Sequence, residues 1–428
     1  MNTQLLIEKL QNGELDNRLL EIYVDSKLIE YQRNRYIAAI KKFEDLYKEG
    51  EVVLFSAPGR SEVGGNHTDH QHGCVLAAAV DLETVADVRL NGTDMIWIRS
   101  EGYPAFSVDI NDLEVNESEK NTTVALVRGV VAGFVNRGVQ IQGFDAKIHS
   151  TVLPGSGLSS SAAFEVLIGT IINELFNEGK VSAEEIAMIG QYAENVYFGK
   201  PCGLMDQMAS SVGSLVYIDF ENPKQPVVEK IDFNLADAGY ALCIIDSGAD
   251  HADLTDEYAA IPMEMKQVCS LFGKDVLREI PEETFLAAIP TLRGQVSDRA
   301  ILRAMHIYRE NERVAKQVQA LKNKDVDAFL NLIKESGNSS WKYLQNITPA
   351  GAVKHQEVAV ALALCDTYLK GQGAYRVHGG GFAGTVQAFV PFDMLEQFRA
   401  RIDNALGEGA CHVLSIRPQG GVIMEVAE

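Results

Sequence analysis

The chain has 428 residues, of which 46% are hydrophobic and 23% are charged, a balance typical of a globular protein with one large domain or two. Lys and Arg number 38 against 59 Asp and Glu, so the formal net charge is −21, which disfavours binding to nucleic acid or to an anionic membrane. Six scattered cysteines without a Cys-x-x-Cys pair predict free thiols in a reducing compartment. Because the first 16 residues are too polar for a signal peptide and no 18-residue apolar run occurs, we expect a cytoplasmic protein without a membrane span.

The first half of the chain alternates between helical and strand patterns. Residues 5–48 are predicted to be helical, and the serine and glutamate of Ser182-Ala183-Glu184-Glu185 form a capping box that predicts the start of a helix ending at Gly199. Residues 199–208 are expected to form a loop. The other predicted helices of this half are 121–136 and 162–176, and its predicted strands are 52–55, 74–80, 84–90, 95–99, 144–153 and 214–220.

The second half is richer in helices. The polar, proline-containing residues 221–226 are the best candidate boundary, so we expect an N-terminal domain over 1–222 and a C-terminal domain over 223–428. The pattern is typical of a mixed α+β protein. The predicted helices are 256–272, 282–288, 298–322, 325–334, 351–369 and 392–406, and the predicted strands include 240–246 and 421–426.

A glycine loop followed by a serine run stands between the strand 144–153 and the helix 162–176. Its central sequence is Pro154-Gly155-Ser156-Gly157-Leu158-Ser159-Ser160-Ser161. A helix start carries unpaired N–H groups and the positive end of the helix dipole, and glycines let the backbone close on an anion. The stretch therefore favours a polyphosphate site, although an ordinary serine-capped helix after a glycine turn is compatible with the same sequence.

Two other readings of the glycine-rich segments are excluded. The chain has no G-x-x-x-x-G-K-[ST] sequence, so it carries no Walker P-loop. Residues 379–384 match G-x-G-x-x-G, but residues 385–391 after them read as a strand where a dinucleotide fingerprint requires a helix. Glycines at this density instead let the backbone approach another backbone or a ligand.

Polar and charged residues elsewhere match the requirements of phosphoryl transfer. Transfer to an alcohol needs a magnesium ligand, a cation on the transferring group and often a carboxylate near the attacking hydroxyl. Ser160 or Ser161, with Glu194, Arg60 and Asp206, carry those groups, although spacing alone does not bring them together and each charge also fits a solvated surface. The histidines and aspartate within residues 67–72 lack a standard metal-ligand spacing and suit a polyol better.

At this point three motifs resemble those of the GHMP small-molecule kinases, and among them the galactokinases most closely. The resemblance covers the chain from about residue 55 to its end. Residues 57–60 with His67-Thr68-Asp69 resemble the first motif, 153–165 the second, 379–384 the third, 199–207 the catalytic-aspartate loop, and Glu257-Tyr258 a sugar-contacting pair.

The resemblance implies a two-domain α+β fold, with a ferredoxin-like C-terminal domain, and transfer of the γ-phosphoryl group of ATP to the anomeric hydroxyl of a sugar. Asp206 and Arg60 would be catalytic, and Ser161 and Glu194 would hold Mg²⁺. The ATP phosphates would be bound by Pro154, Gly155, Ser156, Gly157, Leu158, Ser159 and Ser160. The sugar would be bound by Asn66, His67, Asp69, Gly203 and Tyr258, with Gly380 and Gly381 from the third motif.

The sequence departs from the family pattern on the sugar side. Asn66 and His70 stand where galactokinases usually carry glutamate and tyrosine, Asp250-His251 stands in place of an arginine, and no Arg-Arg follows Tyr258. Galactose is the leading substrate because Asn66 can still form a hydrogen bond to a hydroxyl. Galacturonate, N-acetylgalactosamine and another hexose stay open, since a neutral residue would not repel a carboxylate and Asp69-His70-Gln71 resembles plant galacturonate kinases.

Two other classes fit the sequence less well. Mevalonate and homoserine kinases share the second motif but lack the His-Thr-Asp and Met-Asp-Gln sequences. A non-catalytic sugar sensor is disfavoured because the serine-alanine loop, Asp206 and Arg60 are all present. The expected partners are ATP and a small sugar, without nucleic acid or membrane, in a monomer or homodimer.

Overall fold

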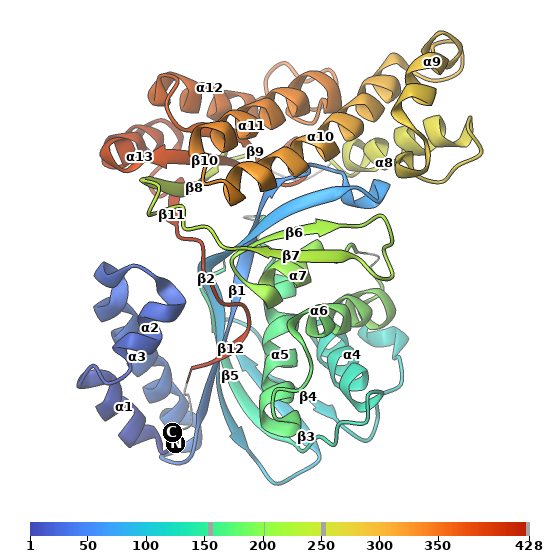
Figure 1. Cartoon of the computed structure of the whole chain (residues 1–428). Coiled ribbons are helices and arrows are strands. Elements are labelled where there is room, and N and C mark those ends of the chain that lie inside the picture. The colour runs from blue at the N-terminus through green and yellow to red at the C-terminus, as the bar shows by residue number, and fades with distance from the viewer. Residues whose placement is uncertain (153–156, 201, 250–253, 425–428) are drawn as a thin grey trace.

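The computed structural model describes residues 1–152, 157–200, 202–249 and 254–424. Within these ranges, eight strands form a large sheet in which β12, β1, β2, β5, β3 and β4 are consecutive and β6 and β7 extend from β2 (Figure 1). The strands are β1 Val53–Gly64, β2 Cys74–Leu90, β3 Met95–Ser100, β4 Phe106–Asp109, β5 Phe144–Ser150, β6 Leu215–Asp219, β7 Val227–Ile231 and β12 Val422–Ile423.

β2 is one strand of 17 residues, whereas the sequence predicted two strands with a break. The break disappears because β2 pairs with β1 along both its halves, with β6 near its start and with β5 near its end. The pairing with β1 shifts register between Pro58 and Arg60 and again between Glu62 and Gly64. These irregularities lie where β1 carries Arg60, and bulges of this kind commonly re-aim a side chain.

The two faces of the large sheet are covered by different helices (Figure 1). Val52, Leu54 and Val85 are buried against the N-terminal helices, whereas Phe55 and Ala86 are buried on the opposite face, as the two-residue period of a strand requires. The segment 1–49, most of which the sequence predicted to be helical, therefore covers one side of this sheet. The helices are α1 Thr3–Gln11, α2 Asp16–Tyr23 and α3 Ile29–Tyr47 on one side, and α4 Thr123–Val135, α5 Ser160–Asn177, α6 Ala183–Tyr192 and α7 Met205–Val212 on the other.

A second sheet, of four antiparallel strands within the described ranges, has the order β11, β8, β10, β9. Its strands are β8 Tyr240–Asp246, β9 Ala374–Val377, β10 Thr385–Pro391 and β11 Cys411–Leu414. Helices α12 (Glu357–Leu369) and α13 (Phe392–Leu406) pack on one face. The other face packs on α10 (Asp298–Lys322) and α11 (Val326–Ser339), which share one core with β2 and so join the two sheets.

These layers confirm the predicted two-domain α+β fold. The division at residue 222 stays a prediction. β7 and β12 follow that residue in the chain, yet they pair with β6 and β1 of the large sheet. The remaining helices, α8 (Thr255–Ser270) and α9 (Glu282–Leu292), share a core with α10 and lie beside its start (Figure 1). Among the described residues no helix has the length and hydropathy to cross a membrane.

Three local expectations can be compared with the structure. The capping box is confirmed, since Ser182 accepts from the backbone of Glu185 and the Glu185 carboxylate accepts from the backbone of Ser182. The helix it starts ends at Tyr192, and a π-helical turn, η4 (Ala193–Phe198), continues to Gly199. The predicted loop 199–208 is shorter than expected because α7 begins at Met205. The remaining short helical turns are η1 Ser26–Leu28, η2 Asp69–Gln71, η3 Glu117–Glu119, η5 Leu277–Glu279 and η6 Ser340–Leu344.

Candidate active site

Arg60 and Asp206, 146 residues apart in the chain, form an ion pair. Nε of Arg60 donates to Oδ1 of Asp206 at 2.8 Å, and Nη1 of Arg60 donates to the carbonyl of Gly157. The backbone N–H of Arg60 also donates to the carbonyl of Leu158 at 3.0 Å. β1, the segment before α5 and the first turn of α7 therefore meet at this pair.

Ser159 holds the second carboxylate oxygen of Asp206. Its hydroxyl donates to Oδ2 of Asp206, and its backbone lies in the left-handed region with φ 55°, a conformation that costs a non-glycine residue energy and is often found at functional sites. Burial acts to raise the pKa of Asp206, but the charge and hydrogen bond of Arg60 and the hydrogen bond from Ser159 outweigh it, so the pKa lies below its ordinary value. Asp206 is therefore held as a carboxylate.

Glu194 and Glu165 form a pair of carboxylates, and the side-chain amide of Gln207, the residue after Asp206, bridges them. Nε2 of Gln207 donates to Oε2 of Glu194 at 2.9 Å and to Oε2 of Glu165 at 3.0 Å. All three side chains are buried. Burial, and then the charge of Glu194, raise the pKa of Glu165 well above its ordinary value, and Oε1 of Glu165 has no hydrogen-bond partner among the described residues.

A cavity of about 190 Å³ brings these groups together. It is lined by Asp69, Ser159, Ser161, Glu194, Lys200, Cys202, Gly203, Met205, Asp206 and Gln207. Six of these residues were predicted from the sequence to be catalytic, to bind ATP or the sugar, or to hold a metal. The structure thus brings residues that the sequence predicted to bind phosphate, metal and sugar to one cavity.

The donor set beside this cavity suits a divalent cation with oxygen ligands. Within the described ranges no three His, Cys, Asp or Glu side chains converge to hold a metal ion. Ser161 and Glu194 line the same cavity, and Mg²⁺ is commonly bound by one or two protein oxygens together with substrate phosphates and water. The unpartnered oxygen of Glu165, next to Glu194, fits a site that needs positive charge.

Of the predicted sugar residues in the turn after β1, Asp69 lines the cavity, whereas His67 lies against the third motif. Oδ1 of Asp69 is 3.1 Å from Nδ1 of His70, and a Cβ atom on Gly203 would lie 2.9 Å from Oδ2 of Asp69, so glycine at 203 keeps that carboxylate accessible. His67 has φ 60° and its Nε2 lies 3.0 Å from the carbonyl of Gly380. Burial, and then the neighbouring His70, lower the pKa of His67 to about 4.

Asn66 is placed differently from the neighbouring sugar residues. Its side chain is fully buried, and Nδ2 donates to Glu62 at 3.1 Å and to the carbonyl of Gly379 at 2.8 Å. Its Oδ1 accepts from Ser340 at 3.1 Å and from Asn346 at 2.9 Å. In this conformation Asn66 supports the third motif from within the protein, so its direct contact with a sugar stays a prediction.

The third motif connects β9 to β10, which confirms that a strand and not a helix follows it. Tyr258 of α8 lies against it and donates from its hydroxyl to the carbonyl of Gly381 at 2.9 Å. A Cβ atom on Gly380 would lie 2.8 Å from the Tyr258 ring, and one on Gly381 would lie 2.0 Å from the carbonyl oxygen of Asn346. The glycines are therefore needed for close approach, as the sequence predicted.

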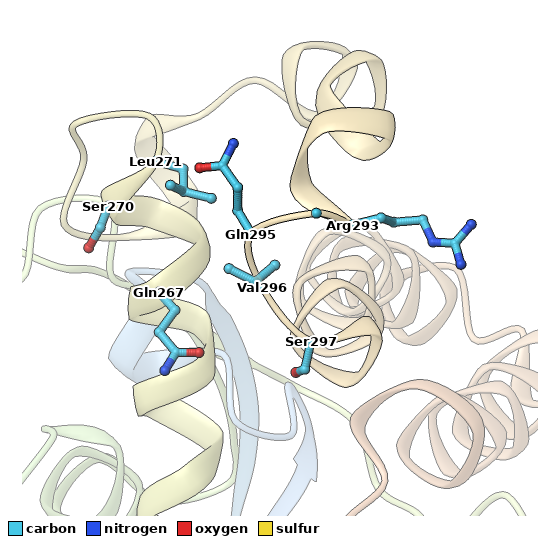
Figure 2. A pocket seen from close by; sticks show the side chains of 8 residues that line it. Gln267, Ser270, Leu271, Arg293, Gln295, Val296 and Ser297 are labelled. Carbon is cyan, nitrogen blue, oxygen red and sulfur yellow. The ribbon is translucent and has the colours of Figure 1, made fainter.

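A larger hollow lies away from these residues. It measures about 600 Å³ and lies between the end of α8 and the connection from α9 to α10 (Figure 2). Gln267 lines it from α8 and Leu271 from the residue just after that helix, and Gln295 faces them, while the Arg293 guanidinium points away (Figure 2). It contains none of the predicted site residues and no carboxylate, so its lining does not supply the groups of phosphoryl transfer.

Sequence reasoning assigned no role to several residues of the site. Glu165 follows the serine run and Gln207 follows Asp206, so both lie inside motifs that were recognised, but only the fold shows that they share a hydrogen bond. His378, just before the third motif, is buried and lies 3.1 Å from Ser61 Oγ and 2.9 Å from Thr385 Oγ1. Nothing in its sequence context signals that position. Pro154, Gly155, Ser156, Asp250 and His251 lie outside the described residues.

Comparison with known proteins first defines the class. The family model for the GHMP kinases N terminal domain matches residues 125–214, and the galactokinase galactose-binding signature matches residues 41–90. The crystal structure of Lactococcus lactis galactokinase complexed with galactose has a TM-score of 0.73 at 24% sequence identity, covering 89% of this chain and 98% of that one. A mevalonate kinase structure aligns with a TM-score of 0.61 at 13% identity, covering 86% and 99%, so the fold is that of the GHMP kinases.

Curated relatives then narrow the class to one family. The galactokinase of Glaesserella parasuis is 33% identical over 84% of this chain and 91% of the relative. The galactokinase of Streptomyces coelicolor is 29% identical over 89% and 96%. The chain belongs to the galactokinase family of the GHMP kinases, and it is a sugar kinase.

Proposed function

We propose that the protein transfers the γ-phosphoryl group of ATP to the anomeric hydroxyl of galactose. The observation that carries this proposal is the Arg60–Asp206 ion pair of 2.8 Å, which lies beside a cavity lined by Ser161 and Glu194. Phosphoryl transfer is catalysed mainly by positioning and by neutralising charge, and these side chains are suited to both tasks.

In this proposal Asp206 orients the acceptor hydroxyl, and Arg60 neutralises charge on the transferring group. Because Arg60 and Ser159 lower the pKa of Asp206, the carboxylate is a weak proton acceptor in the absence of substrate. A loose phosphoryl-transfer transition state leaves the hydroxyl proton in place until late, so a weakly basic carboxylate that accepts a hydrogen bond fits this chemistry.

The ATP phosphates would be held at the start of α5, by residues 154–160. Helix starts bind anions through free N–H groups and the helix dipole. Ser161 and Glu194 would hold Mg²⁺, which when bound draws the phosphate oxygens together and offsets their charge. The six cysteines are free thiols, which fits a cytoplasmic location.

The sugar would occupy the end of the cavity near Asp69, with His67, Gly203 and Tyr258 around it and the third-motif glycines behind. Oxygen and nitrogen acceptors at this end suit hydroxyl groups. An anionic hexose such as galacturonate is the second candidate. Nε2 of His70 is buried without a hydrogen-bond partner among the described residues, and Asn66 is neutral where the family usually has glutamate.

The test is ADP release, coupled to an indicator reaction, measured across galactose, galacturonate, N-acetylgalactosamine and glucose at equal concentrations with Mg²⁺-ATP. We expect galactose to give the highest kcat/KM, and phosphorus NMR to show the product as a 1-phosphate. Turnover of galacturonate without turnover of galactose would reverse the order of the two candidates. No turnover of any hexose, with sugar binding preserved in calorimetry, would favour a sugar sensor.

A further inference from the structure

Lys200 is a cation at the catalytic cavity that none of the roles above uses. It directly follows Gly199, and the backbone N–H groups of both residues donate to the carbonyl of Glu194, at 3.0 Å for Gly199 and 3.1 Å for Lys200. These two bonds fix the point where the Lys200 side chain leaves the backbone. From there the side chain lines the same cavity as Ser161 and Asp206.

The ammonium group of Lys200 is held loosely. Its Nζ lies 4.0 Å from Oε1 of Glu194, and its side chain is 66% exposed. The Arg60 side chain, in contrast, is held in place, since it donates to Asp206 and to the carbonyl of Gly157. An ammonium has three donors and a flexible stem, so Lys200 can turn toward an anion that enters the cavity.

The charges of the cavity call for such a cation. Asp69, Glu194 and Asp206 line it with carboxylates, and Lys200 carries the one cationic side chain among the described residues that line it. The end of a nucleoside triphosphate brings further negative charge and three acceptor oxygens. We propose that Lys200 is a catalytic residue that binds the terminal phosphoryl group of ATP during its transfer. This proposal rests on the proposed function.

The deciding experiment compares nucleotide binding in Lys200→Met with that in the wild-type protein. Isothermal calorimetry with Mg²⁺ measures Kd for ADP and for a non-hydrolysable triphosphate analogue. Because a hydrogen bond to a charged group is lost only when the third phosphate is present, we expect the analogue to bind about tenfold more weakly. The affinity for ADP should change by less than about twofold, and Lys200→Arg should restore most of the loss.

Lys180 provides the matched control. It is also 66% exposed and pairs with a glutamate, Glu178, but it does not line the cavity. Lys180→Met should leave both affinities and the turnover unchanged. In steady-state assays Lys200→Met should lower kcat with little change in the sugar KM.

Three results would overturn the assignment. The first is that Lys200→Met binds the triphosphate analogue with unchanged affinity, and the second is that it loses affinity equally for ADP and for the analogue. The third is that it loses affinity only for an anionic sugar. The binding assay needs no sugar turnover. A wild-type protein that phosphorylates no hexose would therefore contradict the proposed function, while the Lys200 contact would still be decided by the ratio of the two affinities.

Discussion

Two charged networks on the large sheet differ in what surrounds them. The Arg60–Asp206 pair borders a cavity, and the Asp206 side chain is 34% exposed. The Glu83 cluster (Tyr23, Arg35, Ser56, Glu83 and Arg417) lies under the N-terminal helices, and its central carboxylate and Arg417 are 0% exposed. Both networks pair carboxylates with arginines, yet only the first leaves room for another molecule.

The two networks differ in how many hydrogen bonds their central carboxylate accepts, and this number decides whether the carboxylate can bind another molecule. Glu83 accepts hydrogen bonds from the hydroxyls of Tyr23 and Ser56. It also accepts from the guanidiniums of Arg35 and Arg417. These bonds tie α2, α3 and the segment after β11 to the sheet, so the cluster serves stability. Asp206 receives bonds from one arginine and one serine and still faces the cavity, so it can accept a bond from a substrate hydroxyl.

The largest expected effect is on catalysis, from replacing Asp206. Asp206→Asn keeps the side-chain shape but removes its charge, and we expect kcat to fall by about 10²–10⁴-fold. The midpoint of thermal unfolding should change little, because the Asp206 side chain is partly exposed and the asparagine oxygen can still accept the hydrogen bond from the buried Arg60. Activity within a few fold of wild type would contradict the assigned role.

The matched control is Asp219→Asn. Asp219 pairs with Arg278 at 3.0 Å and does not line the cavity. Its replacement removes a carboxylate from an arginine pair of similar geometry and should leave kcat unchanged.

The second prediction breaks the Glu83 cluster and should affect stability instead. Arg417→Met removes a guanidinium that donates to Glu83 and to Ser56, each at 2.6 Å, and leaves buried polar groups without partners. We expect the free energy of unfolding, measured with urea, to fall by about 3–5 kcal/mol. The folded fraction should retain the wild-type kcat.

An exposed ion pair gives the comparison for that loss. Arg293 pairs with Asp298 at 3.2 Å, and both side chains are about two-thirds exposed, at 65% and 68%. Arg293→Met should cost about 0–1 kcal/mol. A similar cost for the two arginine variants would show that burial does not distinguish these networks.

The third prediction concerns Asp87, which lies four residues beyond Glu83 on β2 and has no arginine partner in the part of the chain that the structure describes. It is fully buried, and neither carboxylate oxygen has a hydrogen-bond partner among the described residues. Burial raises its pKa from 3.8 to about 7 in the folded protein, partly offset by Lys147. The folded state therefore holds a proton that the unfolded state loses above about pH 4, so this group costs stability as the pH rises from about 4 to 7.

Asp87→Asn should accordingly stabilise the protein at pH 8, by up to about 4 kcal/mol, and should have little effect near pH 4. Urea unfolding of both proteins at several pH values measures the difference, and taking the difference cancels the titration of the neighbouring His149, whose pKa burial lowers to about 4. An equal effect at pH 4 and pH 8 would show that Asp87 does not carry the proton.

The sequence by itself determined the fold class and the motifs. The capping box at Ser182, the strand after the third motif and the missing Walker lysine could all be read locally, because caps, strands and phosphate loops depend on neighbouring residues. The serine run left Ser160 and Ser161 open as the metal ligand, and the resemblance to the galactokinases then marked Ser161 and Asp206 as candidate site residues.

Only the tertiary structure decided which side chains meet. Hydrogen bonds between Arg60 and Asp206, or between Gln207 and Glu165, join residues 146 and 42 positions apart, and no local pattern encodes such a distance. The structure also separated Asn66 from its neighbours, because the third motif and η6 enclose its amide while His67 and Asp69 remain partly open. Burial depends on what the rest of the chain places around a residue, so a motif can name a site without showing which of its members face the cavity.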